Sequence, residues 1–258
     1  MAEVFNDYAK YYDLLYKDKN YAEEANYIHG LLQKHKAGTK TVLNLGCGTG
    51  KHDVCLQRLG YQICGVDLSE MMLVEAAKHT ILGELEFFHG DVRNVNLGKT
   101  FDAVISLFHV MSYQVTDDDV LSAFTTAYRH LKDGGVFVFD FWHGEGVVSD
   151  PPAVRVKCLE DDTVKIIRTA NPVMHPDRHV IDVNYRIAAM NKRSGRQSEL
   201  RETHVMRYFF LAELKQFLLQ TGFEINEGFE WMSDRPLGSA WYGLLVANKK
   251  GGSGCVLG

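Results

Sequence analysis

Short apolar runs alternate with amphipathic stretches between residues 40 and 142. Thr41–Leu45, Gln62–Val66, Leu85–His89, Ala103–Phe108 and Val136–Phe141 are rich in β-branched or aromatic residues, which is typical of buried strands. The intervening stretches show helical spacing of apolar positions. This alternation predicts an α/β fold with a doubly wound, mostly parallel sheet.

Helices are predicted between these strands at Gly50–Leu59, Ser69–His79 and Asp117–Leu131. Ser69 is a good N-cap residue, and three aspartates at the start of the third helix favour the positive end of its dipole. The first forty residues, rich in tyrosine, are expected to form helices that cover one edge of the sheet.

The pattern changes after Pro151-Pro152, where strands with partial alternation follow one another without helices. These predicted strands are Val154–Cys158, Val164–Arg168, Val180–Ala188 and Thr203–Tyr208. We therefore expect an antiparallel insert or lid at 150–207, a core made of 1–149 and 208–249, and a flexible tail at 250–258. The core is predicted to close with a helix at Ala212–Gln220 and strands at Phe223–Trp231 and Trp241–Asn248. The insert is expected to help build an acceptor pocket or a homodimer contact.

Composition narrows the range of partners. The formal net charge is −5, so the chain has no overall excess of Lys and Arg to attract the phosphates of a nucleic acid. A small-molecule substrate is therefore favoured over nucleic acid. No apolar run reaches membrane-spanning length, and no secretion signal follows Met1. Five cysteines without a CxxC pair suit a reducing, cytoplasmic location.

Candidate chemistry begins at Gly46-Cys47-Gly48-Thr49-Gly50, where a predicted strand ends, the chain turns and a helix begins. Asp67 ends the second strand, where a carboxylate can accept both hydroxyls of a ribose. Asp91 ends the third, where it can accept an exocyclic amine of a base. The fourth strand ends at the same edge of the sheet. Each element alone is a simple turn or a helix cap; together they indicate a nucleoside-containing ligand.

This combination resembles the class I S-adenosylmethionine-dependent methyltransferases over residues 1–142 and the last two strands. The resemblance implies a Rossmann-like fold and S-adenosyl-L-methionine as cofactor, with its methionine part wrapped by the glycine loop. It also implies that Asp67 binds the ribose, and that the adenine lies between Leu68, Asp91 and Val92, with Leu107 beside the methionyl group. The chain departs from the family at Asn44, where an acid is usual.

A narrower resemblance links Tyr12-Asp13-Leu14-Leu15-Tyr16, Lys19–Ala25 and the GTGxH form of the loop to nucleotide-linked amino-sugar N-methyltransferases. It implies that Tyr12 and Tyr21 lie near the methionine carboxylate or the substrate and that His52 belongs to the cofactor site. An amine acceptor needs only to lose a proton, whereas a hydroxyl needs a base or a metal. Since no metal-ligand spacing appears, nitrogen methylation is favoured.

Three side chains just beyond strand ends are candidate catalytic residues: His109, Tyr113 and His143. For each of them taken alone, a structural or substrate-contacting role is favoured over catalysis. Small-molecule O-methylation and non-catalytic cofactor binding stay open as alternatives. A nicotinamide-dependent oxidoreductase is disfavoured because its usual fingerprint is GxGxxG.

Overall fold

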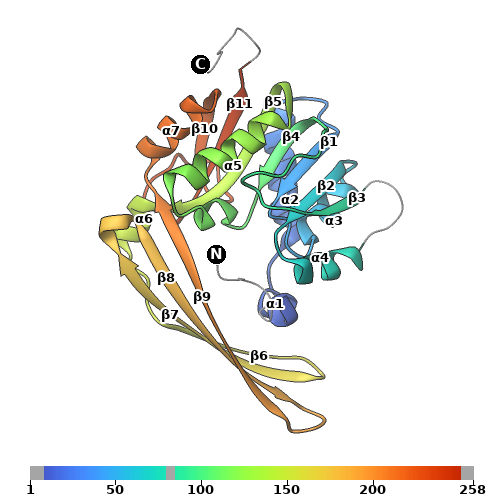
Figure 1. Cartoon of the computed structure of the whole chain (residues 1–258), viewed down its shortest axis with the longest axis vertical. Helices are drawn as coiled ribbons and strands as arrows, with labels where there is room; N and C mark the ends of the chain where they lie inside the picture. Colours follow the sequence, from blue (N-terminus) through green and yellow to red (C-terminus); the bar gives the residue numbers. More distant parts are fainter. Residues whose placement is uncertain (1–8, 80–84, 251–258) are drawn as a thin grey trace.

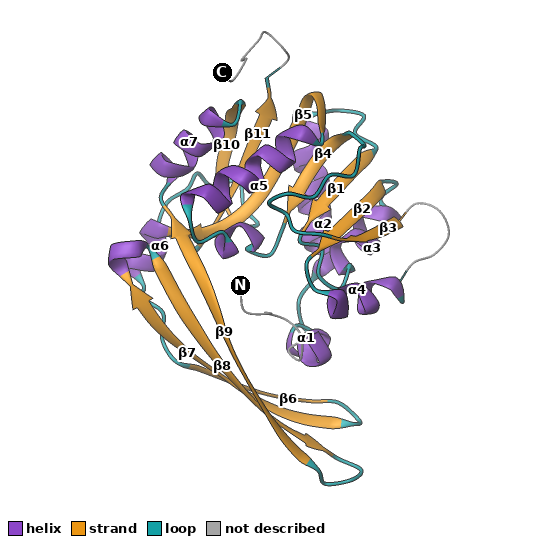
Figure 2. Cartoon of the chain, in the orientation of Figure 1, coloured by secondary structure: helices purple, strands orange, loops and turns teal. Residues whose placement is uncertain are grey.

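The computed structural model describes residues 9–79 and 85–250, and the tail predicted at 250–258 lies outside them except for its first residue. Five parallel strands form the centre in the order β3-β2-β1-β4-β5 (Figures 1 and 2). β11 pairs antiparallel with β5, and β10 pairs with β11, which confirms the doubly wound, mostly parallel sheet. The strands are β1 (Thr41–Leu45), β2 (Gln62–Asp67), β3 (Leu85–His89), β4 (Phe101–Ser106), β5 (Leu131–His143), β10 (Phe223–Glu230) and β11 (Tyr242–Lys249).

Helices cover both faces of this sheet. α2 (Tyr21–His35) and α3 (Lys51–Arg58) bury Ile28, Leu32 and Leu56 against one face, whereas α5 (Asp117–Arg129) and α7 (Leu211–Gln220) pack on the other. α2 thus lies on a face of the sheet, not along the edge where we expected the N-terminal helices, because its apolar stripe is wide enough to cover central strands. The predicted cap holds, since the Ser69 side chain accepts from the Met72 amide at the start of α4 (Glu70–Ala77).

A four-stranded antiparallel block follows the fifth strand and extends away from the core (Figure 1). It joins the core where Trp142 and His143 of β5 pair with Tyr208 and Phe209. Three of its strands are several residues longer than predicted. Their outward positions carry both polar and apolar residues, so the alternation from which the strand ends were predicted is interrupted. The remaining elements are α6 (Gly144–Ser149), β6 (Arg155–Glu160), β7 (Val164–His175), η2 (Pro176–Arg178), β8 (Val180–Asn191) and β9 (Gln197–Phe209).

The short helix α1 (Ala9–Leu15) bridges the core and this block. Tyr12 and Leu15 share an apolar cluster with Met72 of α4 and with Ile166 and Ile187 of the block. A ligand site at the carboxyl ends of the parallel strands is therefore walled by three separate parts of the chain. Among the described residues, no helix is long and apolar enough to cross a membrane.

Candidate functional site

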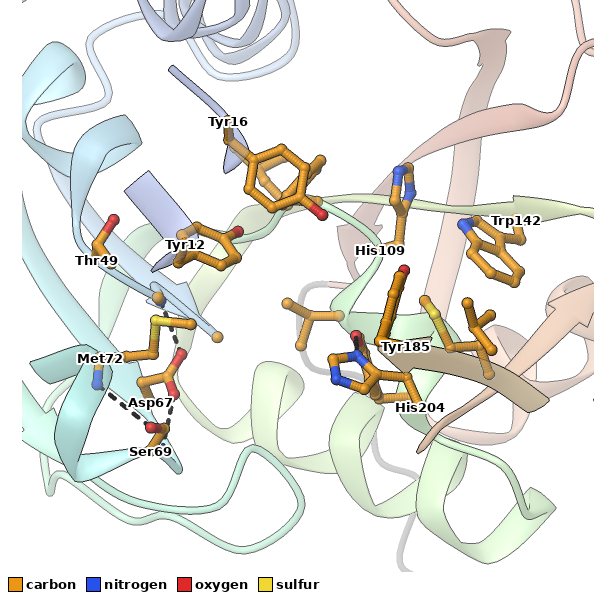
Figure 3. A pocket seen from close by; sticks show the side chains of 18 of the residues that line it. Tyr12, Tyr16, Thr49, Asp67, Ser69, Met72, His109, Trp142, Tyr185 and His204 are labelled. Atoms are coloured by element: carbon orange, nitrogen blue, oxygen red, sulfur yellow. Dashed lines mark hydrogen bonds between the residues drawn. The ribbon is translucent and has the colours of Figure 1, made fainter. Parts of the chain in front are cut away.

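A cavity of about 1100 Å³ begins at the glycine loop after β1 and continues to the inward face of the antiparallel block. Figure 3 shows the two halves, with Tyr12 and Asp67 on one side and Tyr185 and His204 on the other. This volume is slightly larger than is usual for a single small-molecule site, and the two halves of the cavity come from different structural units.

The glycine loop needs its glycines for two different reasons. Gly46, Gly48 and Gly50 all have positive φ, which side chains other than glycine rarely adopt. A Cβ at Gly46 would lie 2.4 Å from Val110 and one at Gly50 would lie 2.6 Å from Phe87. Gly48 has open space instead, so its backbone is the part of the loop that a ligand can approach.

Asp67 anchors this loop from the end of β2. Its Oδ2 accepts from the Gly48 amide at 2.8 Å and its Oδ1 accepts from the Ser69 amide at 2.9 Å. Burial raises the pKa of its carboxyl group. Each oxygen keeps a lone pair, so the side chain can accept from a ligand hydroxyl in the cavity that it lines.

Asp91 also lines the cavity, but Arg93 holds both of its oxygens, with Nη2 to Oδ2 at 2.5 Å and Nε to Oδ1 at 2.9 Å. Arg93 binds Asp119 of α5 as well, at 2.7 Å. Oδ1 also accepts from the Arg93 amide at 2.9 Å, so the carboxylate is fixed in orientation beside Val92.

The N-terminal helices supply the wall above the loop. His52 Nε2 lies 2.7 Å from the Glu24 carboxylate, which also binds Lys19, so α2 is tied to the loop helix α3. Tyr21 lies edge-on to His52 at 4.9 Å. Its hydroxyl is buried at the cavity wall without a hydrogen-bond partner among the described residues. A ligand polar group is the partner that such an atom needs.

The loop after β4 contains two successive strained residues. Phe108 and His109 both have left-handed backbone conformations, with φ of 68° and 66°. The His109 amide donates to Asp140 at 2.9 Å, and the imidazole stacks on Tyr242 at 4.5 Å. Asp140 and Tyr242 therefore hold His109 in place at the cavity wall.

The antiparallel block supplies the far half of the cavity through the inward positions of its strands. Three cations line it, Arg155, Lys157 and Arg168, against one acid, Asp150. No ion pair of Arg155 or Lys157 is present within 9–79 and 85–250. Aromatic rings complete this half: Trp142, Tyr185, Trp241 and Tyr242.

Thirteen of the fifteen predicted site residues line this one cavity. They are Tyr12, Tyr21, Gly46, Cys47, Gly48, His52, Asp67, Leu68, Asp91, Val92, Leu107, His109 and Tyr113. Their individual roles remain predictions.

Gly50 and His143 are placed elsewhere. Gly50 lies behind the loop against Phe87, where it starts α3. His143 is buried beside Phe141, with Nε2 2.6 Å from Glu145, because successive strand residues point to opposite faces and Trp142 takes the cavity side. His143 is therefore not a cavity residue, and its expected catalytic role loses its geometric basis.

The inward residues of the block, above all Arg168, Tyr185 and His204, line the cavity without having been predicted from the sequence. Their signal is the period of two that places them among buried neighbours such as Ile166, Ala170 and Val183. The period of two can be seen in the sequence, but it does not show that the polar residues at the inward positions face a ligand.

The cavity residues fit S-adenosylmethionine at the glycine-loop end. Its amino acid and ribose parts would find complementary groups in the open backbone at Gly48, in Asp67 as a hydroxyl acceptor and in the Tyr21 hydroxyl, which has no partner among the described residues. Asn44, at the position where the family usually has an acid, donates to buried Asp53 at 2.6 Å behind the loop.

Comparison with known proteins agrees with this geometry. A protein family described as a methyltransferase domain matches residues 42–135. The dTDP-3-amino-3,4,6-trideoxy-alpha-D-glucopyranose N,N-dimethyltransferase of Streptomyces venezuelae is 28% identical over 242 residues, covering 93% of this chain and 97% of its own.

Solved structures show the same similarity. Streptomyces venezuelae DesVI superposes with a TM-score of 0.78 at 27% identity, covering 94% of this chain and 98% of that one. The sugar N-methyltransferase KedS8 from Streptoalloteichus sp ATCC 53650 shares the fold with a TM-score of 0.79 at 23% identity, covering 93% and 92%. The likeness thus extends well beyond the residues that match the domain family.

Proposed function

The chain is a class I S-adenosylmethionine-dependent methyltransferase, and we propose that it methylates the amino group of a nucleotide-linked amino sugar. The observation that carries this proposal is the single cavity that joins the glycine loop to the cationic and aromatic face of the antiparallel block. Such a cavity can hold a donor at one end and a large anionic acceptor at the other.

The acceptor half has the groups that a nucleoside diphosphate needs. Arg155 and Lys157 of β6 and buried Arg168 of β7 provide positive charge for a diphosphate. The flat rings of Trp241 and Tyr242 can stack on a base. The Streptomyces venezuelae relative, which acts on a dTDP-linked amino sugar by its name, supports the same class.

When bound, S-adenosylmethionine supplies a methyl group on an activated sulfonium. The chain's own residues bind, orient and exclude water. Asp67 and Gly48 hold the donor end, Tyr12 and Phe108 close the cavity from the α1 side, and Trp142 offers a buried indole N–H without a partner among the described residues. Alignment of two bound reactants supplies several kcal/mol of rate enhancement without any covalent step on the protein.

An acceptor panel tests the proposal. We expect methyl transfer to a dTDP-linked amino sugar, little transfer to the same amino sugar without the nucleotide, and none to the dTDP-linked sugar with a hydroxyl in place of the amine. Equal methylation of the hydroxyl sugar would favour O-methylation instead. Equal rates with and without the nucleotide would remove the proposed role of the cationic face.

A further inference from the structure

Tyr113, His204 and Glu202 form a chain of polar contacts beside the acceptor half of the cavity. The Tyr113 hydroxyl lies 2.8 Å from His204 Nδ1, and His204 Nε2 lies 3.2 Å from the Glu202 carboxylate. Tyr113 belongs to the short 3₁₀ helix η1 (Val110–Tyr113), whereas the other two are two residues apart on the same side of β9. Both Tyr113 and His204 line the cavity.

The partners assign the protons along this chain. A carboxylate only accepts, so the His204 proton lies on Nε2 and faces Glu202. Nδ1 of the neutral ring then accepts, and the Tyr113 hydroxyl donates to it. Burial lowers the pKa of His204, with Glu202 opposing and Arg168 adding to the shift, so the ring is neutral near pH 7.

Other groups hold this imidazole in place. Tyr185 of β8 lies edge-on to His204 at 4.8 Å, and the Arg168 guanidinium of β7 lies 5.3 Å from the centre of the Tyr185 ring. Within the described part of the chain, the titratable and charged groups around His204 include Tyr113, Arg168, Tyr185 and Glu202. Figure 3 shows His204 and Tyr185 on the side of the cavity opposite Asp67.

We propose that Tyr113, backed by His204 and Glu202, removes the proton from the ammonium form of the acceptor before methyl transfer. The ammonium N–H bond breaks and an O–H bond forms on Tyr113, while the original Tyr113 proton moves to His204 Nδ1. The resulting imidazolium is stabilised by Glu202, and the freed nitrogen lone pair is ready to accept the methyl group. Glu202 is a positioning residue. This step rests on the proposed amine acceptor.

The pH dependence of kcat/KM separates this role from a structural one. An enzyme that removes the proton can use the ammonium form, whereas one that lacks the relay depends on the free amine. We expect His204→Gln and Tyr113→Phe to lower kcat/KM about 10- to 100-fold near pH 7. The loss should shrink as pH rises through the pKa of the amine, and Glu202→Gln should show a smaller loss with the same trend.

His175→Gln is the matched control, because His175 also contacts a carboxylate on the same block, Asp182 at 3.0 Å, but does not line the cavity. It should leave the pH profile unchanged, and all variants should bind S-adenosylmethionine as the wild type does. If kcat/KM of His204→Gln and Tyr113→Phe is reduced by the same factor at every pH, the relay is wrong, whereas the proposed amine acceptor is unaffected. Failure of the wild type to methylate any nucleotide-linked amine would overturn both.

Discussion

Replacement of Asp53 by asparagine should remove a pH dependence of stability that the fold creates beneath the glycine loop. Asp53 is fully buried in the first turn of α3. One oxygen accepts from Asn44 at 2.6 Å, and the other has no hydrogen-bond partner among the described residues. Burial, opposed by the Asn44 contact and aided by the charge of Asp67, raises the pKa of Asp53 to about 7.

The size and sign of the effect follow from this pKa. Between the ordinary value of 3.8 and about 7, the folded protein binds one more proton at Asp53 than the unfolded chain. The free energy of unfolding therefore falls as pH rises through this window, by about 1.4 kcal/mol per pH unit and by ~4 kcal/mol over the whole window. Asp53→Asn cannot titrate, so its stability relative to the wild type should increase from pH 4 to 7 and then level off.

Urea unfolding between pH 5 and 8 measures this difference. Asp102→Asn is the control, because hydrogen bonds to Lys132 and Thr41 outweigh burial and lower the pKa of Asp102. The stability that ionised Asp102 contributes is lost only as pH falls below the ordinary carboxyl range. Between pH 5 and 8 the Asp102→Asn variant should therefore differ from the wild type by a constant free energy of unfolding. Parallel pH profiles for Asp53→Asn and the wild type would refute the argument.

Three further predictions concern the cavity. His109→Asn should lower turnover about 10- to 100-fold without abolishing it, as measured with an amine acceptor; a loss beyond about ten-thousandfold would favour O-methylation. Lys157→Ala should raise KM for a dTDP-linked acceptor about three- to tenfold with kcat nearly unchanged, while Lys165→Ala on the outward face of β7 should change neither in steady-state assays. Gly46→Ala should weaken cofactor binding and lower the melting temperature, because its Cβ would meet Val110 at 2.4 Å; wild-type values in both would contradict the loop geometry.

The parallel core could be predicted closely from the sequence, because its strands are buried on both faces and appear as continuous apolar runs. Thr41–Leu45 is such a strand and is observed with the predicted bounds. Leu85–His89 is also observed with its predicted bounds, although it lies at the edge of the sheet and is only partly buried. Antiparallel strands were predicted after the parallel core and are observed, but β8 continues beyond its predicted end, to Asn191. The outer portion of the block is exposed on one face. There the alternation of apolar and polar residues that indicates a strand is less regular.

The placement of Asp67 and Gly48 in the cavity was predictable because both lie at or just after strand ends. The acceptor end depends on contacts distant in sequence, such as Tyr113 with His204, 91 residues apart. No local pattern indicates such a pair. His143 shows the opposite failure: its place at a strand end suggested a role, but the alternation of side chains turns it away from the cavity.

Equilibrium binding of S-adenosylmethionine, its demethylated product and NAD to the wild type and to Asp67→Ala decides whether the glycine-loop end of the cavity is an S-adenosylmethionine site. We expect both S-adenosyl compounds to bind and NAD not to bind. Asp67→Ala should weaken binding of both compounds by about 1.5–3 kcal/mol, roughly 10- to 150-fold, through lost hydrogen bonds to a charged group. Binding of NAD in preference to the S-adenosyl compounds, or an unchanged affinity in Asp67→Ala, would contradict this assignment.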